Sequence, residues 1–272
     1  MPDEARDYLL GTHDEEVERL GLQHRVWRSR VLDAWRRAGI TQGSTLVDAG
    51  AGPGWASFDL AEIVGPSGRV HALERSDRFF AHLTETARQR GLQAIAPACL
   101  DLVTDPLPVT GADAFWIRWV LAFVSDPGLV LSKLAATLRP GGTAVIHEYW
   151  DWGVYRLAPQ APLHREWVDF VLADWRSSGG EPDIGRELTT LLPAAGLRVR
   201  EVRPLNEIVG PTDAMWGWPA GFLRIYLDRL VSEGKRPREW ADRVRAELDA
   251  AERRPEALMS TPMIIEVIAE KL

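Results

Sequence analysis

At 272 residues, the chain is long enough for one α/β domain with an elaboration or for two small domains, and its 46% apolar and 26% charged residues are typical of a globular protein. Its net charge of −7, with no basic run to offset it, argues against a nucleic-acid or anionic-membrane surface. A single cysteine, Cys99, leaves no internal disulfide bond, and no apolar run suggests export or a membrane span, so we expect a cytoplasmic protein.

Residues 1–43 precede the first predicted strand and are expected to form a cap of two helices. Thr12 and Glu15 have the spacing of a capping box, which predicts that the first helix begins there. The second helix is predicted over residues 22–38, with one apolar face, and Gly39 ends it.

The stretch from residue 44 to residue 64 predicts a strand, a tight turn and a helix in succession. A short apolar strand ends at Asp48, helical spacing begins at Trp55, and three glycines lie between them: Gly50, Gly52 and Gly54. Glycine follows such a turn at low cost, because the backbone must visit positive φ and approach a ligand closely. This combination forms the nucleotide-binding corner of a doubly wound α/β domain.

The details of the turn favour a ligand that carries positive charge. The dinucleotide fingerprint needs a third glycine where this chain has Trp55, and the Gly-Lys-Ser/Thr ending of a phosphate-binding loop does not occur. A pyrophosphate would also lie poorly beside the Asp48 carboxylate. S-adenosylmethionine fits, since it carries a sulfonium and an ammonium group and no phosphate. A glycine turn in a fold that binds nothing is the alternative.

Residues 47–54 resemble the first motif of the class I S-adenosylmethionine-dependent methyltransferases, with the sequence Val-Asp-Ala-Gly-Ala-Gly-Pro-Gly. The resemblance continues to about residue 150, and it looks most like the broad group of small-molecule methyltransferases related to the ubiquinone/menaquinone C-methyltransferases. It implies a Rossmann-like, seven-stranded sheet with the last strand antiparallel, and S-adenosylmethionine as cofactor with S-adenosylhomocysteine as product. The motif says little about the methyl acceptor.

Two acidic residues follow the next two predicted strands. Glu74 ends a strand about 20 residues after the glycines, where doubly wound folds offer a carboxylate to ribose hydroxyls. Asp101 and Leu102 follow a strand predicted over residues 93–98, and the resemblance assigns them the adenine amino group and the adenine ring. The alternatives are an acidic helix cap for Glu74 and a plain turn residue for Asp101.

The fourth strand, predicted over residues 114–121, is apolar except for Arg118, which fits burial on both faces. Arg118 and Trp119 lie near its carboxyl end, where such folds bind ligands. The resemblance also implies an N-terminal segment that closes over the cofactor, although a cap that only packs is equally physical. The expected cofactor-binding residues are Tyr8, Gln23, Asp48, Gly50, Gly52, Gly54, Glu74, Arg75, Asp101, Leu102, Arg118 and Trp119.

The fifth strand, predicted over residues 143–150, ends in polar residues that we expect near the acceptor. His147, Glu148 or His24 could act as the catalytic base, should the acceptor carry a proton of high pKa, although a structural role is the expectation for each. Strand alternation points His147 and Glu148 to opposite faces, so at most one of them can reach the donor methyl group. The residues expected around the acceptor are His24, Tyr149, Trp152, Trp216 and Trp218.

About 55 residues separate the sixth strand, predicted over residues 197–203, from the last strand, predicted over residues 262–269. This is far more than a hairpin needs. The insertion contains an aromatic loop and a helix, residues 222–231, that is apolar almost all round. We expect it to be a lid over the acceptor; a homodimer interface is the alternative, because such a helix must be covered by something.

The predicted domains are a helical cap (1–43), a methyltransferase domain (44–205 and 259–272) and the helical insertion (206–258). The predicted function is methyl transfer to an O, N or C atom of a small aromatic or hydrophobic metabolite, in secondary or quinone-like metabolism. Rival hypotheses are a non-catalytic module that binds the same cofactor, and a nucleotide-dependent oxidoreductase, which Trp55 and Asp48 disfavour. No zinc-type spacing occurs, so we expect no metal.

Overall fold

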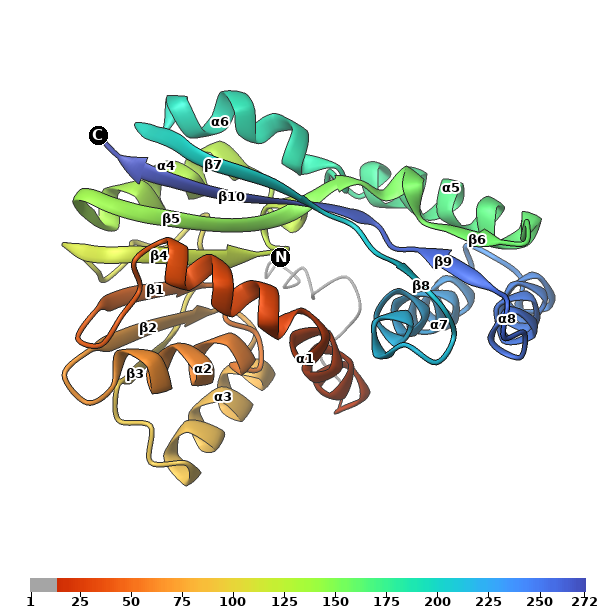
Figure 1. Ribbon diagram of the computed structural model, residues 1–272, viewed down its shortest axis with the longest axis horizontal. Coiled ribbons are helices and arrows are strands. Elements are labelled where there is room, and N and C mark those ends of the chain that lie inside the picture. Colours follow the sequence, from red (N-terminus) through yellow and green to blue (C-terminus); the bar gives the residue numbers. More distant parts are fainter. Residues whose placement is uncertain (1–13) are drawn as a thin grey trace, which may run out of the picture.

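In a computed structural model, which describes residues 14–272, the chain is built on a seven-stranded sheet (Figure 1). The strand order is β3-β2-β1-β4-β5-β10-β7. β10 is antiparallel to both of its neighbours, and the other adjacent strands are parallel. The strands are β1 (Thr45–Ala49), β2 (Arg69–Glu74), β3 (Ile95–Cys99), β4 (Ala112–Arg118), β5 (Leu138–Asp151), β7 (Leu197–Leu205) and β10 (Met263–Lys271).

Helices cover both faces of this sheet. β2 and β3 lie on one side of β1 whereas β4 and β5 lie on the other, so right-handed crossovers place the connecting helices on opposite faces. One face carries α1 (Asp14–Arg37), α2 (Trp55–Val64) and α3 (Asp77–Gln89), and the other carries α4 (Pro127–Thr137) and α6 (Leu188–Ala194) (Figure 1). The doubly wound, Rossmann-like fold that the sequence predicts is thereby confirmed. None of the helices within residues 14–272 has the length and apolarity needed to cross a membrane.

Local sequence explains where two of these helices begin. The Ser76 hydroxyl accepts a hydrogen bond from the Phe79 amide (3.3 Å) and caps α3. The Asp126 carboxylate accepts one from the Leu129 amide (2.8 Å) and caps α4, whose first residue is Pro127. The caps fix the points at which the chain leaves the ligand-binding edge of the sheet.

The prediction of two N-terminal helices is wrong for the described residues, because α1 is a single helix from Asp14 to Arg37. Gly21 lies inside it without interrupting it. A Cβ at that position would lie 3.2 Å from the Trp55 indole, so the glycine allows α1 to approach α2 closely. Thr12, the predicted cap of the first helix, lies outside the described residues.

The insertion and the chain segment that follows β5 together form a second substructure beside the main sheet. The insertion's strands β8 (Ile208–Val209) and β9 (Leu258–Ser260) pair in a small sheet of order β6-β9-β8, and β6 (Arg156–Ala158) comes from outside the insertion. α7 (Gly217–Ser232) and α8 (Arg238–Glu252) lie beside α5 (Pro162–Ser177) at this end of the molecule (Figure 1). The insertion is therefore continuous with residues 152–177, which the sequence assigns to the methyltransferase domain. The 3₁₀ helices are η1 (Leu121–Phe123), η2 (Trp152–Val154), η3 (Ile184–Glu187) and η4 (Ala214–Trp216).

A buried charge network ties the last turn of α1 to the antiparallel edge of the sheet. The Arg37 guanidinium forms ion pairs with Glu266 of β10, Glu201 of β7 and Asp33 one turn back. Glu266 is buried and also bonds to His147 Nε2 of β5 (2.9 Å). Removing Arg37 would leave the Glu266 carboxylate without its main cationic partner inside the protein.

We therefore expect Arg37→Ala to lower the free energy of unfolding by about 3 kcal/mol, the usual cost of leaving a buried charge uncompensated. The matched control is Arg36→Ala, because the Arg36 side chain is 75% exposed and should contribute less than about 0.5 kcal/mol. Urea unfolding of both variants measures the difference. Equal, small losses would show that Arg37 does not anchor α1.

Candidate cofactor and acceptor site

A pocket of about 70 Å³ lies at the carboxyl ends of β1 and β4, where doubly wound sheets bind ligands. Helix α1, the glycine turn and the two strands all contribute to its wall. The lining residues are Leu20, Gln23, Asp48, Gly50, Ala51, Gly52, Pro53, Trp55, Ala56, Trp116 and Arg118. Of the twelve residues that the sequence predicts to bind the cofactor, five line this pocket: Gln23, Asp48, Gly50, Gly52 and Arg118.

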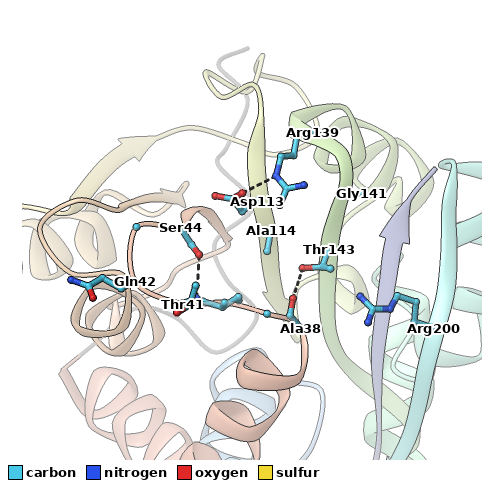
Figure 2. A pocket seen from close by; sticks show the side chains of 13 residues that line it. Ala38, Thr41, Gln42, Ser44, Asp113, Ala114, Arg139, Gly141, Thr143 and Arg200 are labelled. Carbon is cyan, nitrogen blue, oxygen red and sulfur yellow. Dashed lines mark hydrogen bonds and ion pairs between the residues drawn. The ribbon is translucent and has the colours of Figure 1, made fainter.

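A larger hollow of about 410 Å³ lies at the opposite edge, near the amino ends of β1, β4 and β5 (Figure 2). Several of its polar groups are paired with one another. Arg139 bonds to Asp113 (2.8 Å), and the Thr143 hydroxyl donates to the Ala38 carbonyl (3.2 Å). The hollow holds no part of the glycine turn, so we place the functional site at the smaller pocket.

The glycine turn has the strained geometry that its sequence predicts. All three glycines have positive φ, with values of 71°, 57° and 95° at Gly50, Gly52 and Gly54. A Cβ at Gly50 would overlap Val120, and one at Gly54 would lie 2.8 Å from Leu83. A side chain at Gly50 would displace Val120, which follows β4, and one at Gly54 would displace Leu83 of α3. At Gly52 the space is open, and the positive φ alone favours glycine.

Asp48 places a carboxylate in the wall of the pocket. It is buried, and its Oδ2 accepts a hydrogen bond from the Ser57 hydroxyl of α2 (2.5 Å). Burial raises the pKa of Asp48 to about 6, against the opposing effects of Ser57 and the Arg118 charge. The group is therefore mainly ionised at neutral pH and attracts a cation such as an amino-acid ammonium group.

Glu74 joins the glycine turn to the start of α3. Its two carboxylate oxygens accept hydrogen bonds from the backbone amides of Gly52 (2.8 Å) and Ser76 (2.7 Å). Desolvation by burial raises the pKa of Glu74. Ser76 rather than Glu74 caps α3. The Glu74 carboxylate accepts from the amides of Gly52, Ser76 and Arg75 and has about four lone-pair sites, so it keeps acceptor capacity for a ribose hydroxyl.

Asp101 has the turn role that was its alternative interpretation. Its Oδ1 accepts hydrogen bonds from the amides of Val103 (2.7 Å) and Thr104 (3.2 Å). Arg75 lies 3.6 Å from the other carboxylate oxygen, and Leu102 is buried beside it. These bonds fix the loop after β3 and leave Oδ2 facing the Arg75 guanidinium.

A chain of polar contacts links α2, α1 and β4 behind the pocket. His24 of α1 contacts Asp59 Oδ2 through Nε2 (3.0 Å) and Arg118 Nη2 through Nδ1 (3.2 Å). Because a guanidinium can only donate, Nδ1 accepts from Arg118 and Nε2–H donates to Asp59, so the imidazole is neutral. Desolvation lowers the pKa of His24 despite the Asp59 hydrogen bond, which agrees with this tautomer.

Arg118 has one donor group left over. Burial lowers the pKa of its guanidinium to about 10, so it remains charged at neutral pH. Nη1 is buried and has no hydrogen-bond partner among the described residues. An unpartnered cationic donor inside a pocket wall is costly, and the carboxylate of a bound amino acid would satisfy it.

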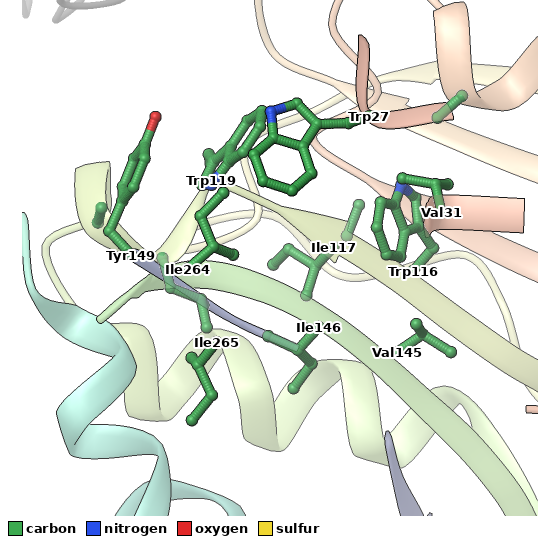
Figure 3. Close-up of a cluster of buried hydrophobic side chains, with 14 of the residues drawn as sticks. Trp27, Val31, Trp116, Ile117, Trp119, Val145, Ile146, Tyr149, Ile264 and Ile265 are labelled. Atoms are coloured by element: carbon green, nitrogen blue, oxygen red, sulfur yellow. The ribbon is translucent and has the colours of Figure 1, made fainter. Parts of the chain in front are cut away.

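Aromatic rings extend from this pocket toward the insertion. Trp119 has a left-handed backbone (φ 53°), a conformation that is costly for a bulky residue and that concentrates at functional sites. Its indole stacks on Tyr149 (5.4 Å between ring centroids) and on Trp218 of α7 (5.3 Å), and it meets the edge of Trp27 (6.1 Å; Figure 3). Trp218 Nε1 donates to Gln23 of α1 (3.0 Å), so the insertion reaches the cofactor pocket.

The two candidate bases of β5 lie on opposite faces of the strand, and neither lines the pocket. His147 is fully buried between the ring of Trp116 and the Glu266 carboxylate. Glu148 Oε1 accepts the backbone amides of Val120 (2.9 Å) and Leu121 (2.8 Å), and burial raises the pKa of Glu148 to about 8. Glu148 therefore holds the turn that follows Trp119, and His147 extends the Arg37 network.

Of the two other tryptophans predicted for the acceptor site, one lies beside its aromatic rings and the other lies within the insertion. Trp152 lies against Tyr149 (5.0 Å between centroids), whereas Trp216 donates to Glu252 of α8 (3.0 Å), within the insertion. Tyr8 lies outside the described residues. Sequence reasoning missed Ser57 and Asp59, which orient Asp48 and His24; both are polar positions on the first two turns of α2, and only the fold shows what they face.

Comparison with known proteins identifies the domain that holds this pocket. Residues 47–146 match the family model of a methyltransferase domain. The match supports a class I S-adenosylmethionine-dependent methyltransferase domain at these residues, and the similar curated proteins include a demethylmenaquinone methyltransferase and a ubiquinone/menaquinone biosynthesis C-methyltransferase. S-adenosylmethionine is the cofactor of this family, and the pocket fits it. The Asp48 carboxylate suits its ammonium group, and the unpartnered Arg118 nitrogen suits its carboxylate. The glycine turn allows the protein backbone to approach the cofactor closely.

Two curated relatives and one solved structure illustrate the similarity. The chain is 31% identical over 229 residues to an uncharacterised 37.1 kDa protein in transposon TN4556 of Streptomyces fradiae (82% of this chain, 63% of that protein). It is 30% identical over 156 residues to a 2-phytyl-1,4-naphtoquinone methyltransferase of Synechococcus elongatus (56% and 61%). The chain also shares its fold with the geranyl diphosphate C-methyltransferase of Streptomyces coelicolor (TM-score 0.57, 16% identity, 92% and 77%). The chain spans about three fifths of the length of the two curated relatives.

The raised pKa of Asp48 predicts how cofactor binding depends on pH. S-adenosylhomocysteine, which keeps the ammonium group, should bind about tenfold more weakly at pH 5 than at pH 7.5, because protonation of Asp48 below about pH 6 removes its charge. Calorimetric titration across this range measures the affinity. In Asp48→Asn the binding should be weaker and nearly independent of pH; a variant that keeps the wild-type slope would assign the titration to another group.

The raised pKa of Glu148 predicts that the protein loses stability as the pH rises. Its pKa is raised from 4.5 to about 8, so its stabilising contribution is complete below about pH 4.5 and is lost as the pH rises through 8. Glu148→Gln imitates the protonated carboxyl, and its Tm should exceed that of the wild type at pH 9 and match it at pH 5. The control is Glu256→Gln, because Glu256 is exposed. Calorimetry measures the Tm of both variants, and an equal change in Tm at pH 9 would contradict the raised pKa of Glu148.

Proposed function

We propose that the protein transfers the methyl group of S-adenosylmethionine to an O, N or C atom of a small aromatic or hydrophobic metabolite, in secondary or quinone-like metabolism. One observation carries the proposal: the pocket that fits the amino-acid end of the cofactor adjoins the stack of Trp119, Tyr149 and Trp218. The acceptor side of the site is therefore apolar and flat-walled. The single, exposed Cys99 is consistent with the reducing cytoplasm in which we place this reaction.

The chain's part in the reaction is to bind, orient and exclude water. Asp48 and Arg118 hold the ammonium and carboxylate groups, Glu74 the ribose hydroxyls, and Asp101 with Leu102 the adenine. S-adenosylmethionine, when bound, supplies a methyl group on a cationic sulfur. Aromatic walls keep water from that centre, so alignment and desolvation contribute much of the rate. The proposal requires no side-chain base, and His147 and Glu148 lie outside the pocket lining.

We assign the insertion to the acceptor site as a lid. Trp218, at the start of α7, stacks on Trp119 and bonds to Gln23, so one end of α7 forms part of the site. The apolar face of α7 includes Phe222, Leu223 and Tyr226, which are buried within the chain. This burial supports the lid, because the apolar face of α7 is covered by the chain itself; a homodimer interface is the alternative.

The proposal is tested by calorimetric titration of purified, ligand-free protein with S-adenosylmethionine, S-adenosylhomocysteine and NAD. We expect micromolar binding of the first two and none of NAD. Absence of adenosyl binding would contradict the methyltransferase proposal, and tight binding of NAD would favour an oxidoreductase. Mass spectrometry of mixtures with aromatic acceptors then separates an enzyme from a module that binds the cofactor without turnover.

Two variants locate the cofactor in the same titration. Asp48→Ala should weaken S-adenosylhomocysteine binding by about tenfold or more, because it removes the charge that faces the ammonium group. His147→Ala should change this affinity less than threefold, since His147 does not line the pocket. Equal losses in the two variants would overturn the assignment of Asp48.

A further inference from the structure

The structure holds two buried polar groups that the proposed reaction does not use. The Tyr155 hydroxyl, just before β6, and His164 Nε2, in the first turn of α5, are both buried and have no hydrogen-bond partner among the described residues. Their rings meet edge to face with centroids 4.4 Å apart. A buried hydroxyl or imidazole that lacks a partner costs free energy, so two in contact point to a missing partner.

This pair is continuous with the aromatic rings of the acceptor side. Tyr155 meets Trp152 (6.1 Å between centroids), Trp152 meets Tyr149, and Tyr149 stacks on Trp119 beside the cofactor pocket. Trp152 Nε1 is also without a partner in the described part of the chain. Partnerless indole nitrogens occur elsewhere in the core, at Trp35 for example, so the argument rests on the hydroxyl and the imidazole.

The surroundings of the pair disfavour an anion. Desolvation lowers the pKa of His164 to about 4 and raises the pKa of Tyr155, so both groups are neutral at pH 7. Arg224, the cation that acts on Tyr155, is already paired with Asp249 (2.8 Å) and Glu252 (2.7 Å). The Glu247 carboxylate of α8 accepts a hydrogen bond from the His164 amide, so a further negative charge lies next to the pair.

We propose that Tyr155 and His164 form the distal end of the acceptor site and bind an uncharged carbonyl or hydroxyl oxygen of a flat, conjugated acceptor. The inference rests on the proposed methyltransferase function and narrows it, because it excludes acceptors that must bury a phosphate or diphosphate at this end. The hydroxyl and the imidazole determine specificity here, and neither takes part in the methyl transfer.

The matched probes are 9-fluorenone and fluorene, two neutral tricyclic compounds that differ in one carbonyl oxygen. In equilibrium dialysis with protein saturated with S-adenosylhomocysteine, fluorenone should bind at least about fivefold more tightly than fluorene, since only its oxygen can accept a hydrogen bond. Tyr155→Phe and His164→Phe should each reduce this ratio, and the double variant should bring it to about one. Geranyl diphosphate should bind more weakly than fluorenone.

The control is Tyr226→Phe, which removes a hydroxyl from the same aromatic cluster. Tyr226 already donates to Asp174 (2.8 Å), so its loss should leave the fluorenone-to-fluorene ratio unchanged. A purely structural Tyr155 would move Tm but not this ratio.

Three results would overturn the inference: a ratio near one in the wild type, a wild-type ratio in the double variant, or tighter binding of geranyl diphosphate. Failure of S-adenosylhomocysteine to bind would instead contradict the proposed function, so the two failures are distinguishable.

Discussion

The arrangement of the site depends on the contact between Arg118 and His24. A guanidinium at the end of a buried strand must be paired, and the nearest neutral acceptor is an imidazole on a helix far away in the sequence. Asp59 of α2 holds that imidazole in the tautomer that can accept. One hydrogen-bond chain therefore places α1 against β4, keeps Leu20 and Gln23 in the pocket wall, and leaves a donor of Arg118 free for the cofactor.

The aromatic layer has a related function. A layer of indole and phenol rings, to which the insertion contributes Trp218, lies beside the cofactor pocket. These rings contact one another. Within residues 14–272, the indole nitrogens of Trp119 and Trp152 have no hydrogen-bond partner. An acceptor would replace ring–ring contacts with ring–ligand contacts of similar area, so the layer serves both as core and as binding surface.

The sequence predicted the sheet well because its signals are local. The glycine turn, the caps at Ser76 and Asp126, and the apolar strands each depend on residues close together in the chain. It predicted Asp48, Glu74 and Arg118 at the ligand edge for the same reason, since parallel strands all end there. It favoured a structural role for His147 and Glu148 but could not show that role, because their partners, Glu266 and the amides after Trp119, come from distant or irregular segments. The role of β6 in the small sheet was invisible for the same reason.

The unbroken length of α1 has a mechanical consequence. At about 1.5 Å per residue, the segment from Leu20 to Arg37 is a rod of about 25 Å. Its last turn is fastened to β7 and β10, whereas its first half forms a wall of the pocket. A tilt of about 10° around the fastened end moves Leu20 by about 4 Å, which follows from the same rise per residue. Such a rotation would move the pocket wall far more than the fastened turn, and the contacts of His24 with Arg118 and Asp59 oppose it.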